Sequence, residues 1–228
     1  MKKIEINQQS SKQKKHFYSI KQMSINTKIL VIFIFSLIFI GILTTVSIVG
    51  MSIISSARAY IAGEGFYARG QKNAVVYLLQ YSTSHNESDY MQFLEAIKIP
   101  LADRDARLEL DKSAFDHNFV RQALINGRNH PDDVDSMIRI ARWMGSASNV
   151  NKAFTFWKKA DEYNMELKKF GADLHDVFSK KPVDNMLLAT MVNKITMLNK
   201  QSVSLQEKFS VLMNRMARNT QENVQTFI

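Results

Sequence analysis

The 228-residue sequence contains no cysteine. It therefore has no disulfide, no thiolate zinc site, no iron–sulfur cluster and no cysteine nucleophile. Glycine and proline are also scarce, with eight and three residues respectively. So few turn-forming residues favour long helices over a sandwich of many short strands. Polar and apolar residues nowhere alternate with period two for more than a few positions, so we predict an all-α fold.

Acidic residues are almost absent from the N-terminal 28 positions, which carry seven lysines and only Glu5. The chain as a whole has a net charge of +9, and most of that excess lies in this arm. A body that binds nucleic acid would concentrate basic side chains along one face. We therefore predict no nucleic-acid partner and a cytoplasmic basic arm over residues 1–28. The arm either contacts anionic membrane lipid or is a solvated tail that only sets topology.

Charge disappears altogether between residues 29 and 57, where the sequence is rich in Ile, Leu, Val and Phe. A helix that crosses a membrane needs about 20 apolar residues, so we predict a transmembrane helix over residues 29–54. Lysine-rich flanks stay in the cytoplasm, which would place everything after residue 55 in the periplasm of a bacterium. The protein would then be a single-pass protein of the inner membrane.

A cleavable signal peptide is the alternative, because Ala57-Arg58-Ala59 resembles a small-x-small cleavage site. The apolar region is, however, longer than the roughly 7–15 residues of a signal sequence. We therefore favour an uncleaved anchor.

Two long stretches of the body repeat apolar or small residues at alternating gaps of three and four, which is a heptad pattern. The first comprises Val150, Ala153, Trp157, Ala160, Asn164, Leu167, Gly171, Leu174 and Phe178. The second comprises Leu188, Met191, Ile195, Leu198, Ser202, Leu205, Phe209, Leu212 and Met216. Pro182 lies between them and predicts a break. Ser202 would form one polar layer in an otherwise apolar seam.

We therefore expect residues 55–218 to form an extracytoplasmic antiparallel helical bundle with long heptad-bearing helices, followed by a polar C-terminal end over residues 219–228. The pattern also predicts shorter helices, with Pro100 ending the second of them. These cover residues 60–81, which would continue the membrane helix, and residues 87–98, 103–110, 117–126 and 134–144.

Several uncommon strings resemble a periplasmic sensor region of bacterial membrane signalling proteins. They are ARAYIAGEGFYARGQKNAVVYLLQY, DYMQFLEAIKIPLADRDARLEL and LINGRNHPDDVDSMIRIARWM, and the resemblance covers roughly residues 55–215. In that family the region precedes diguanylate cyclase/phosphodiesterase or hybrid histidine kinase modules. The resemblance implies that the chain is a sensor that relays a cue by helix movement, with its output module missing from this chain. A stand-alone inner-membrane subunit of an envelope assembly is the alternative.

The stretch GRNHPDDVDSM at residues 127–137 groups a histidine with three carboxylates. Proline at the first helical position and aspartates in the first turn are typical of a helix start. The spacing matches neither a calcium loop nor an HExxH zinc helix. We therefore predict a helix N-terminus here and no metal.

The segment DRDARLELD at residues 103–111 is most simply a ladder of charges on a solvated helix. The alternative is a small anionic ligand, since arginine binds carboxylate or phosphate with two parallel hydrogen bonds. The candidate ligand-binding residues are Arg104, Arg107, Arg121, Arg128 and His130. We interpret the tyrosines and tryptophans as packing residues rather than a ligand cage.

No nucleophile elbow, phosphate-binding glycine loop, kinase signature or cyclase signature is present. We therefore expect no enzyme, no catalytic residue and no cofactor. Long heptad helices further suggest a homodimer formed through the helices.

Overall fold

The computed structural model describes residues 23–144, 148–180 and 185–227. Those residues form helices and no strand, which confirms the all-α prediction. The helices are α2 (Ile25–Ser84), α3 (Glu87–Leu110), α4 (His117–Asn126), α5 (Pro131–Met144), α6 (Ser148–Lys180) and α7 (Asn185–Phe227). Residues 1–22 of the basic arm and the expected break at Pro182 lie outside the described residues.

The chain divides into two compact units, one of residues 1–49 with 227–228 and one of residues 50–226. In the first unit, the Ser24 hydroxyl accepts a hydrogen bond from the Thr27 backbone N–H at 3.3 Å and caps the start of α2. The apolar residues that follow, such as Ile29 and Phe35, are exposed. Among the described residues, α2 is the one helix long and apolar enough to span a membrane, judged by length and composition. As expected, the apolar segment and residues 60–81 belong to one continuous helix.

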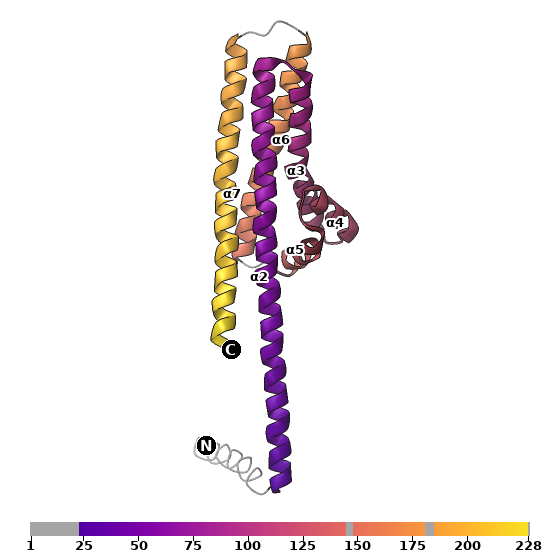
Figure 1. The fold of residues 1–228 in the computed structure, drawn as a ribbon, viewed down its shortest axis with the longest axis vertical. Coiled ribbons are helices and arrows are strands. Elements are labelled where there is room, and N and C mark those ends of the chain that lie inside the picture. Colours follow the sequence, from indigo (N-terminus) through magenta and orange to yellow (C-terminus); the bar gives the residue numbers. More distant parts are fainter. Residues whose placement is uncertain (1–22, 145–147, 181–184, 228) are drawn as a thin grey trace, which may run out of the picture. The chain divides into compact units, whose positions relative to one another are not determined.

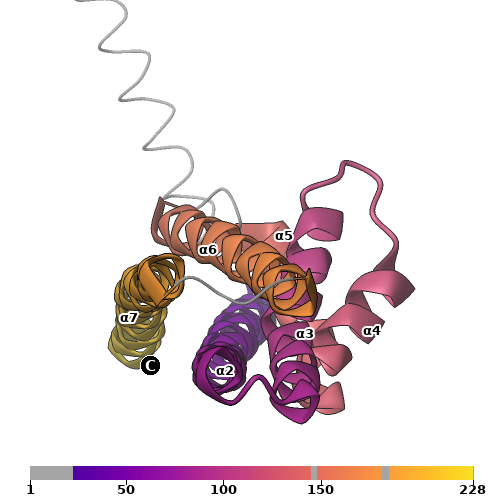
Figure 2. The ribbon, with the colours of Figure 1, turned by 90° about the horizontal axis from the view of Figure 1, so that it is seen from above.

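In the second unit, α2, α3, α6 and α7 lie side by side, and α4 and α5 cover one flank beside α3 (Figures 1 and 2). Along the contact between α2 and α7, residue numbers fall in one helix as they rise in the other. The Gln71 amide donates to Asn199, the Ser210 hydroxyl donates to Glu64, and Gly50 lies against Val224. A Cβ atom on Gly50 would come 2.2 Å from a methyl carbon of Val224, so glycine permits this close approach.

Two apolar clusters fill the interior of this unit. One gathers around Tyr60, Trp157 and Phe209, and the other around Leu78, Phe93 and Ile195. Polar groups are also buried, among them Ser202, which donates a 2.8 Å hydrogen bond to the Gln71 side chain. The polar layer expected at Ser202 is therefore present, and its partner comes from α2.

The heptad pattern of α6 is confirmed, since every position of the predicted seam is buried except Phe178, which is half-buried. The pattern of α7 is confirmed only in part. Its buried stripe moves after Ser202 to Gln206, Phe209, Met213 and Met216, and the predicted Leu205 and Leu212 are half-buried. The residues expected to form a separate polar end continue α7 to Phe227.

The prediction that Pro100 ends a helix is wrong, because α3 runs unbroken through it. Proline removes one backbone hydrogen bond from a helix interior and usually kinks or breaks it. Here α3 packs closely on α2 at Gly70, where an added Cβ atom would come 3.1 Å from Pro100 Cδ. Burial of Pro100 in this helix contact offsets the lost hydrogen bond.

Candidate functional site

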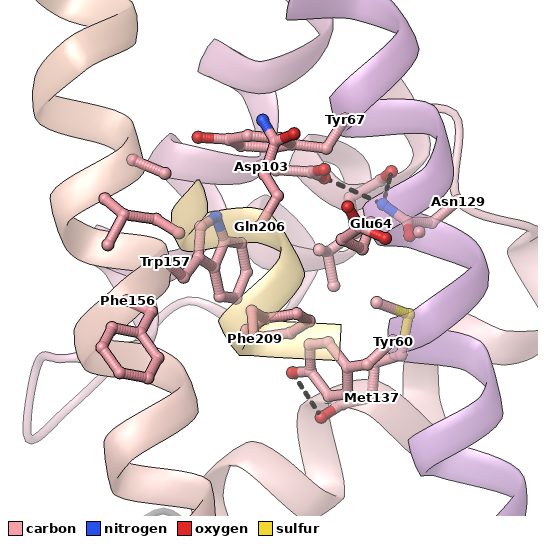
Figure 3. A pocket seen from close by; sticks show the side chains of 14 residues that line it. Tyr60, Glu64, Tyr67, Asp103, Asn129, Met137, Phe156, Trp157, Gln206 and Phe209 are labelled. Carbon is pink, nitrogen blue, oxygen red and sulfur yellow. Dashed lines mark hydrogen bonds between the residues drawn. The ribbon is translucent and has the colours of Figure 1, made fainter. Parts of the chain in front are cut away.

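A small cavity lies inside the second unit, where residues of helices α2 to α7 and of the α4–α5 connection meet (Figure 3). Its volume of about 30 Å³ is enough for a group the size of one or two water molecules. The lining residues are Tyr60, Gly63, Glu64, Tyr67, Asp103, Leu124, Asn129, Met137, Phe156, Trp157, Ala160, Leu205, Gln206 and Phe209. Glu64, Phe156 and Leu205 are the partly exposed residues of the lining.

One face of α2 contributes Tyr60, Gly63, Glu64 and Tyr67, which are spaced so that they share a side of the helix. The Tyr60 hydroxyl donates a hydrogen bond to the Met137 carbonyl of α5 at 3.0 Å. The Tyr67 hydroxyl donates to Asp161 at 3.1 Å and accepts from the Asn164 amide at 2.7 Å. Both hydroxyl groups therefore hold helices together and are already engaged.

The apolar wall of the cavity is aromatic. The rings of Tyr60, Trp157 and Phe209 meet edge to face, with centroids 6.2 to 6.4 Å apart. Aromatic pairs prefer this arrangement because the positive ring edge meets the negative ring face. The sequence-based interpretation of Trp157 and Tyr67 as packing residues holds, and the same side chains also line the cavity. Trp143, in contrast, is 64% exposed.

Asn129 is brought to the cavity by the end of α4. The Asn129 N–H bonds to the Leu124 carbonyl at 3.1 Å and the Arg128 N–H bonds to the Ile125 carbonyl at 2.8 Å. These two bonds form a Schellman motif. Arg128 occupies its left-handed position with φ of 69°, where glycine is usual. The turn places the Asn129 side chain against Gly63 of α2.

The Asn129 side chain is buried and only partly satisfied. Its amide nitrogen donates to Asp103 Oδ1 at 2.8 Å and to the Leu124 carbonyl at 2.9 Å, which uses both N–H groups. Its Oδ1 atom is buried and has no hydrogen-bond partner among the described residues. A buried unsatisfied acceptor costs about 1–3 kcal/mol, so this oxygen is a functional candidate.

Two carboxyl groups face the same space. Asp103 is buried, and burial raises the pKa of its carboxyl well above the usual range, although the Asn129 hydrogen bond lowers it. Glu64 is partly exposed and accepts a 2.8 Å hydrogen bond from Ser210. Partial burial raises the pKa of Glu64 as well. No described lining residue is a lysine or an arginine, so nothing in the lining neutralises these groups when ionised.

A buried ion pair lies next to the cavity. Arg107 Nε donates to Asp161 Oδ2 at 2.7 Å, and both side chains are almost fully buried. Burial raises the pKa of Asp161 to about 7, against the Arg107 guanidinium and the Tyr67 hydroxyl, which lower it. The charge ladder expected over residues 103–111 is therefore wrong for Asp103 and Arg107, which point inward.

Four of the five arginine and histidine candidates lie near carboxylates of their own among the described residues. Arg107 binds Asp161 and Asp111, and Arg104 lies 3.2 Å from Asp105. Arg121 lies 3.6 Å from Asp135, His130 lies 3.7 Å from Asp132, and Arg128 is exposed. None shares an ion-pair partner with another. The anionic-ligand site remains a prediction.

The stretch at residues 127–137 starts a helix, as predicted. Helix α5 begins at Pro131, three residues before the expected Val134, with Asp132 and Asp133 in its first turn. Within the described part of the chain, no three His, Asp or Glu residues are grouped as metal ligands.

Sequence reasoning missed Asp103, Glu64 and Asn129 as site residues. Asp103 had a signal, because it occupies the same buried stripe of α3 as Phe93, Ala96 and Leu110. An aspartate is almost never fully buried in a helix face unless its carboxylate has a partner. Asn129 carried no comparable signal, since its burial depends on the turn before α5.

Comparison with known proteins adds no family to this description. No family model matches the chain, no curated protein matches it, and no solved structure matches it. The cavity and the helices that enclose it are the features that bear on function.

Proposed function

We propose that this protein is a membrane-anchored sensor that binds a small molecule in the cavity lined by α2, α7 and the helices packed against them. It would be the extracytoplasmic input region of a bacterial membrane signalling receptor. The observation that carries the proposal is Asn129, a lining residue beside the buried Asp103 carboxyl, whose buried Oδ1 atom has no hydrogen-bond partner among the described residues. A ligand that supplies hydrogen-bond donors would satisfy this group. The strings that resemble periplasmic sensor regions agree with this role.

The proposed topology places the basic arm in the cytoplasm, where it contacts anionic lipid, and the second unit in the periplasm. The exposed apolar segment of α2 supports an anchor in the inner membrane. Seven lysines before that segment support the orientation.

The cue would be relayed by helix movement within an antiparallel bundle. The cavity is lined by Tyr60 and Glu64 of α2 and by Gln206 and Phe209 of α7. Further along, the same two helices meet at Gly50 and Val224. A ligand shifts such a pair only if it binds two arrangements with different affinities. In this role the protein is not an enzyme and uses no cofactor.

A panel of small amines, carboxylates, polyols and amino acids tests the proposal against the full chain in detergent micelles. We expect at least one class to raise the melting temperature, because a ligand that binds only the folded state stabilises it. Ala160→Val should abolish that increase by filling the cavity, since Ala160 is buried in its lining. Ala172→Val makes the same change at an exposed position of α6 and should keep it. No stabilisation by any class would contradict the proposal.

A second candidate is a subunit of an envelope assembly that uses the bundle as an interaction surface. The exposed apolar side chains of Met197, Val203 and Val211 on α7 favour a partner for that helix. In the sensor this partner would be a second copy of the chain. Purification from detergent separates the candidates, since a homodimer alone fits the sensor and co-purifying envelope proteins fit the assembly subunit.

A further inference from the structure

The geometry points to a small organic ammonium ion, a protonated primary amine with a short apolar chain, as the ligand of the cavity. This inference rests on the proposed function and names the ligand class for the same site.

Hydrogen bonding favours a donor. Asn129 Oδ1 is a buried acceptor to which no described residue donates, and both hydrogens of its amide nitrogen are already engaged. The hydroxyls of Tyr60 and Tyr67 already donate to Met137 and Asp161. An ammonium group carries three donors and no acceptor, so it could donate to Asn129 Oδ1 and would bring no acceptor of its own that needs a partner.

Charge favours a cation. Asp103 and Glu64 are the carboxyl groups in the lining, and none of the described lining residues is basic. A carboxylate at this depth is costly without a partner. An ammonium ion would supply the opposite charge, and the aromatic rings of Tyr60, Trp157 and Phe209 line the same cavity.

Size limits the ligand to a narrow head. The cavity of about 30 Å³ accepts a group about as large as water and excludes a ring. The partly exposed Phe156 and Leu205 give the opening an apolar edge, against which a short alkyl chain can lie. The head of a primary amine and a chain of a few carbons fit this shape.

Binding should release a proton. Burial raises the pKa of the Asp103 carboxyl well above its usual range and so favours the protonated form, and the nearby Asp161 carboxylate raises the pKa further. Burial raises the pKa values of the Tyr60 and Tyr67 hydroxyls, and their electrostatic interaction with Asp103 raises them further. An ammonium ion favours the charged carboxylate, so the Asp103 proton would leave to the buffer.

Isothermal titration of the full chain in micelles tests the inference with three probes of similar size: n-butylamine, 1-butanol and butyrate. We expect saturable binding of n-butylamine at pH 7. The affinities of 1-butanol and butyrate should be lower by a factor of about ten or more, since a buried hydrogen bond to a charged group contributes at least a factor of about ten to affinity. Asp103→Asn should weaken n-butylamine binding about tenfold and abolish the proton release that two buffers of different ionisation enthalpy reveal.

Asp105→Asn is the matched control, because Asp105 lies on the same helix with its side chain 52% exposed. It should leave the affinity unchanged. Glu64→Gln provides a second carboxyl variant, expected to weaken n-butylamine binding about threefold, since Glu64 is only partly buried.

Three results would overturn the inference: 1-butanol or butyrate binding as tightly as n-butylamine, unchanged affinity in Asp103→Asn and Glu64→Gln, or no binding of n-butylamine. Tight binding of a neutral or anionic probe would leave the proposed function standing. If no class in the wider panel binds, both the proposed sensor function and the ammonium ligand are contradicted.

Discussion

Single residues hold the site in place, and Gly63 shows how. A Cβ atom on Gly63 would come 2.1 Å from Asn129 Oδ1. Asn129 could not yield without losing its hydrogen bonds to Asp103 and the Leu124 carbonyl. Gly65, two residues further along α2, has nothing within 4 Å of the same position. The close contact with Asn129 therefore requires glycine at position 63, whereas no such contact requires it at position 65.

The first prediction follows from this pair. Gly65→Ala should stabilise the protein by about 0.5–1 kcal/mol, because alanine loses less backbone entropy than glycine in a helix. Gly63→Ala should destabilise it by about 1–3 kcal/mol, the cost of leaving a buried polar group unsatisfied. Unfolding of the full chain in micelles, followed by circular dichroism, measures both. Equal stabilisation by both substitutions would mean that Asn129 does not pack on α2.

The second prediction concerns pH and Asp103. Its folded-state pKa is raised, so the folded protein binds more protons than the unfolded chain above about pH 4. The stability that Asp103 provides is therefore complete below that pH and is lost as the pH rises toward the folded pKa. Asp103→Asn removes this loss. Relative to the wild type, the variant should gain stability with rising pH by up to about 1.4 kcal/mol per unit.

Asp105→Asn supplies the baseline, since its side chain is half exposed on the same helix. A pH profile of Asp103→Asn that runs parallel to the wild type from pH 4 to pH 7 would show that the Asp103 carboxyl is solvated.

The helices differ in how well the sequence predicted them. The gaps of three and four predicted the buried face of α6 almost completely, because one heptad seam runs the length of that helix. Helix α4 has the predicted bounds, from His117 to Asn126. In α7 the buried stripe drifts after Ser202 to Gln206 and Met213. An α-helix has 3.6 residues per turn, so a strict heptad stripe slips around it unless the helices supercoil.

The buried ion pair and the unbroken helix at Pro100 could not be predicted from local sequence patterns. Arg107 resembled a surface charge in the sequence, and its partner Asp161 comes from another helix 54 positions later. Pro100 carried a strong local signal to end a helix, and packing against Gly70 overrides it. The cavity itself depends on several elements at once, so no single segment contains its signature.

The third prediction tests the drift of α7. Met213→Ala should destabilise the protein by about 2–5 kcal/mol, the usual range for truncating a buried methionine, because Met213 is only 2% exposed. Val211→Ala, on the same helix at 55% exposure, should change stability by no more than about 0.5 kcal/mol. Small effects at both positions in a thermal unfolding experiment would mean that this end of α7 is not packed.

At the scale of the whole molecule, the proposal depends on where the second unit resides. The fourth prediction is that a phosphatase reporter fused after Ile228 is active and a reporter that works only in the cytoplasm is silent there. The lysine excess before the apolar segment gives the physical reason. A cytoplasmic signal, or a mature protein that begins near Tyr60, would contradict the anchored topology.

The central claim is that a ligand in the cavity moves α7 relative to α2. The chain has no cysteine, so two introduced cysteines carry spin labels without background. Arg58 of α2 and Arg218 of α7 are exposed and belong to the same unit. The label-to-label distance is measured by pulsed electron resonance on the full chain in micelles, with and without saturating n-butylamine, and again with Ala160→Val. A shift of about 1–2 Å, typical of helix displacement, is predicted for the open cavity and none for the filled one. An unchanged distance despite measured binding would contradict the account.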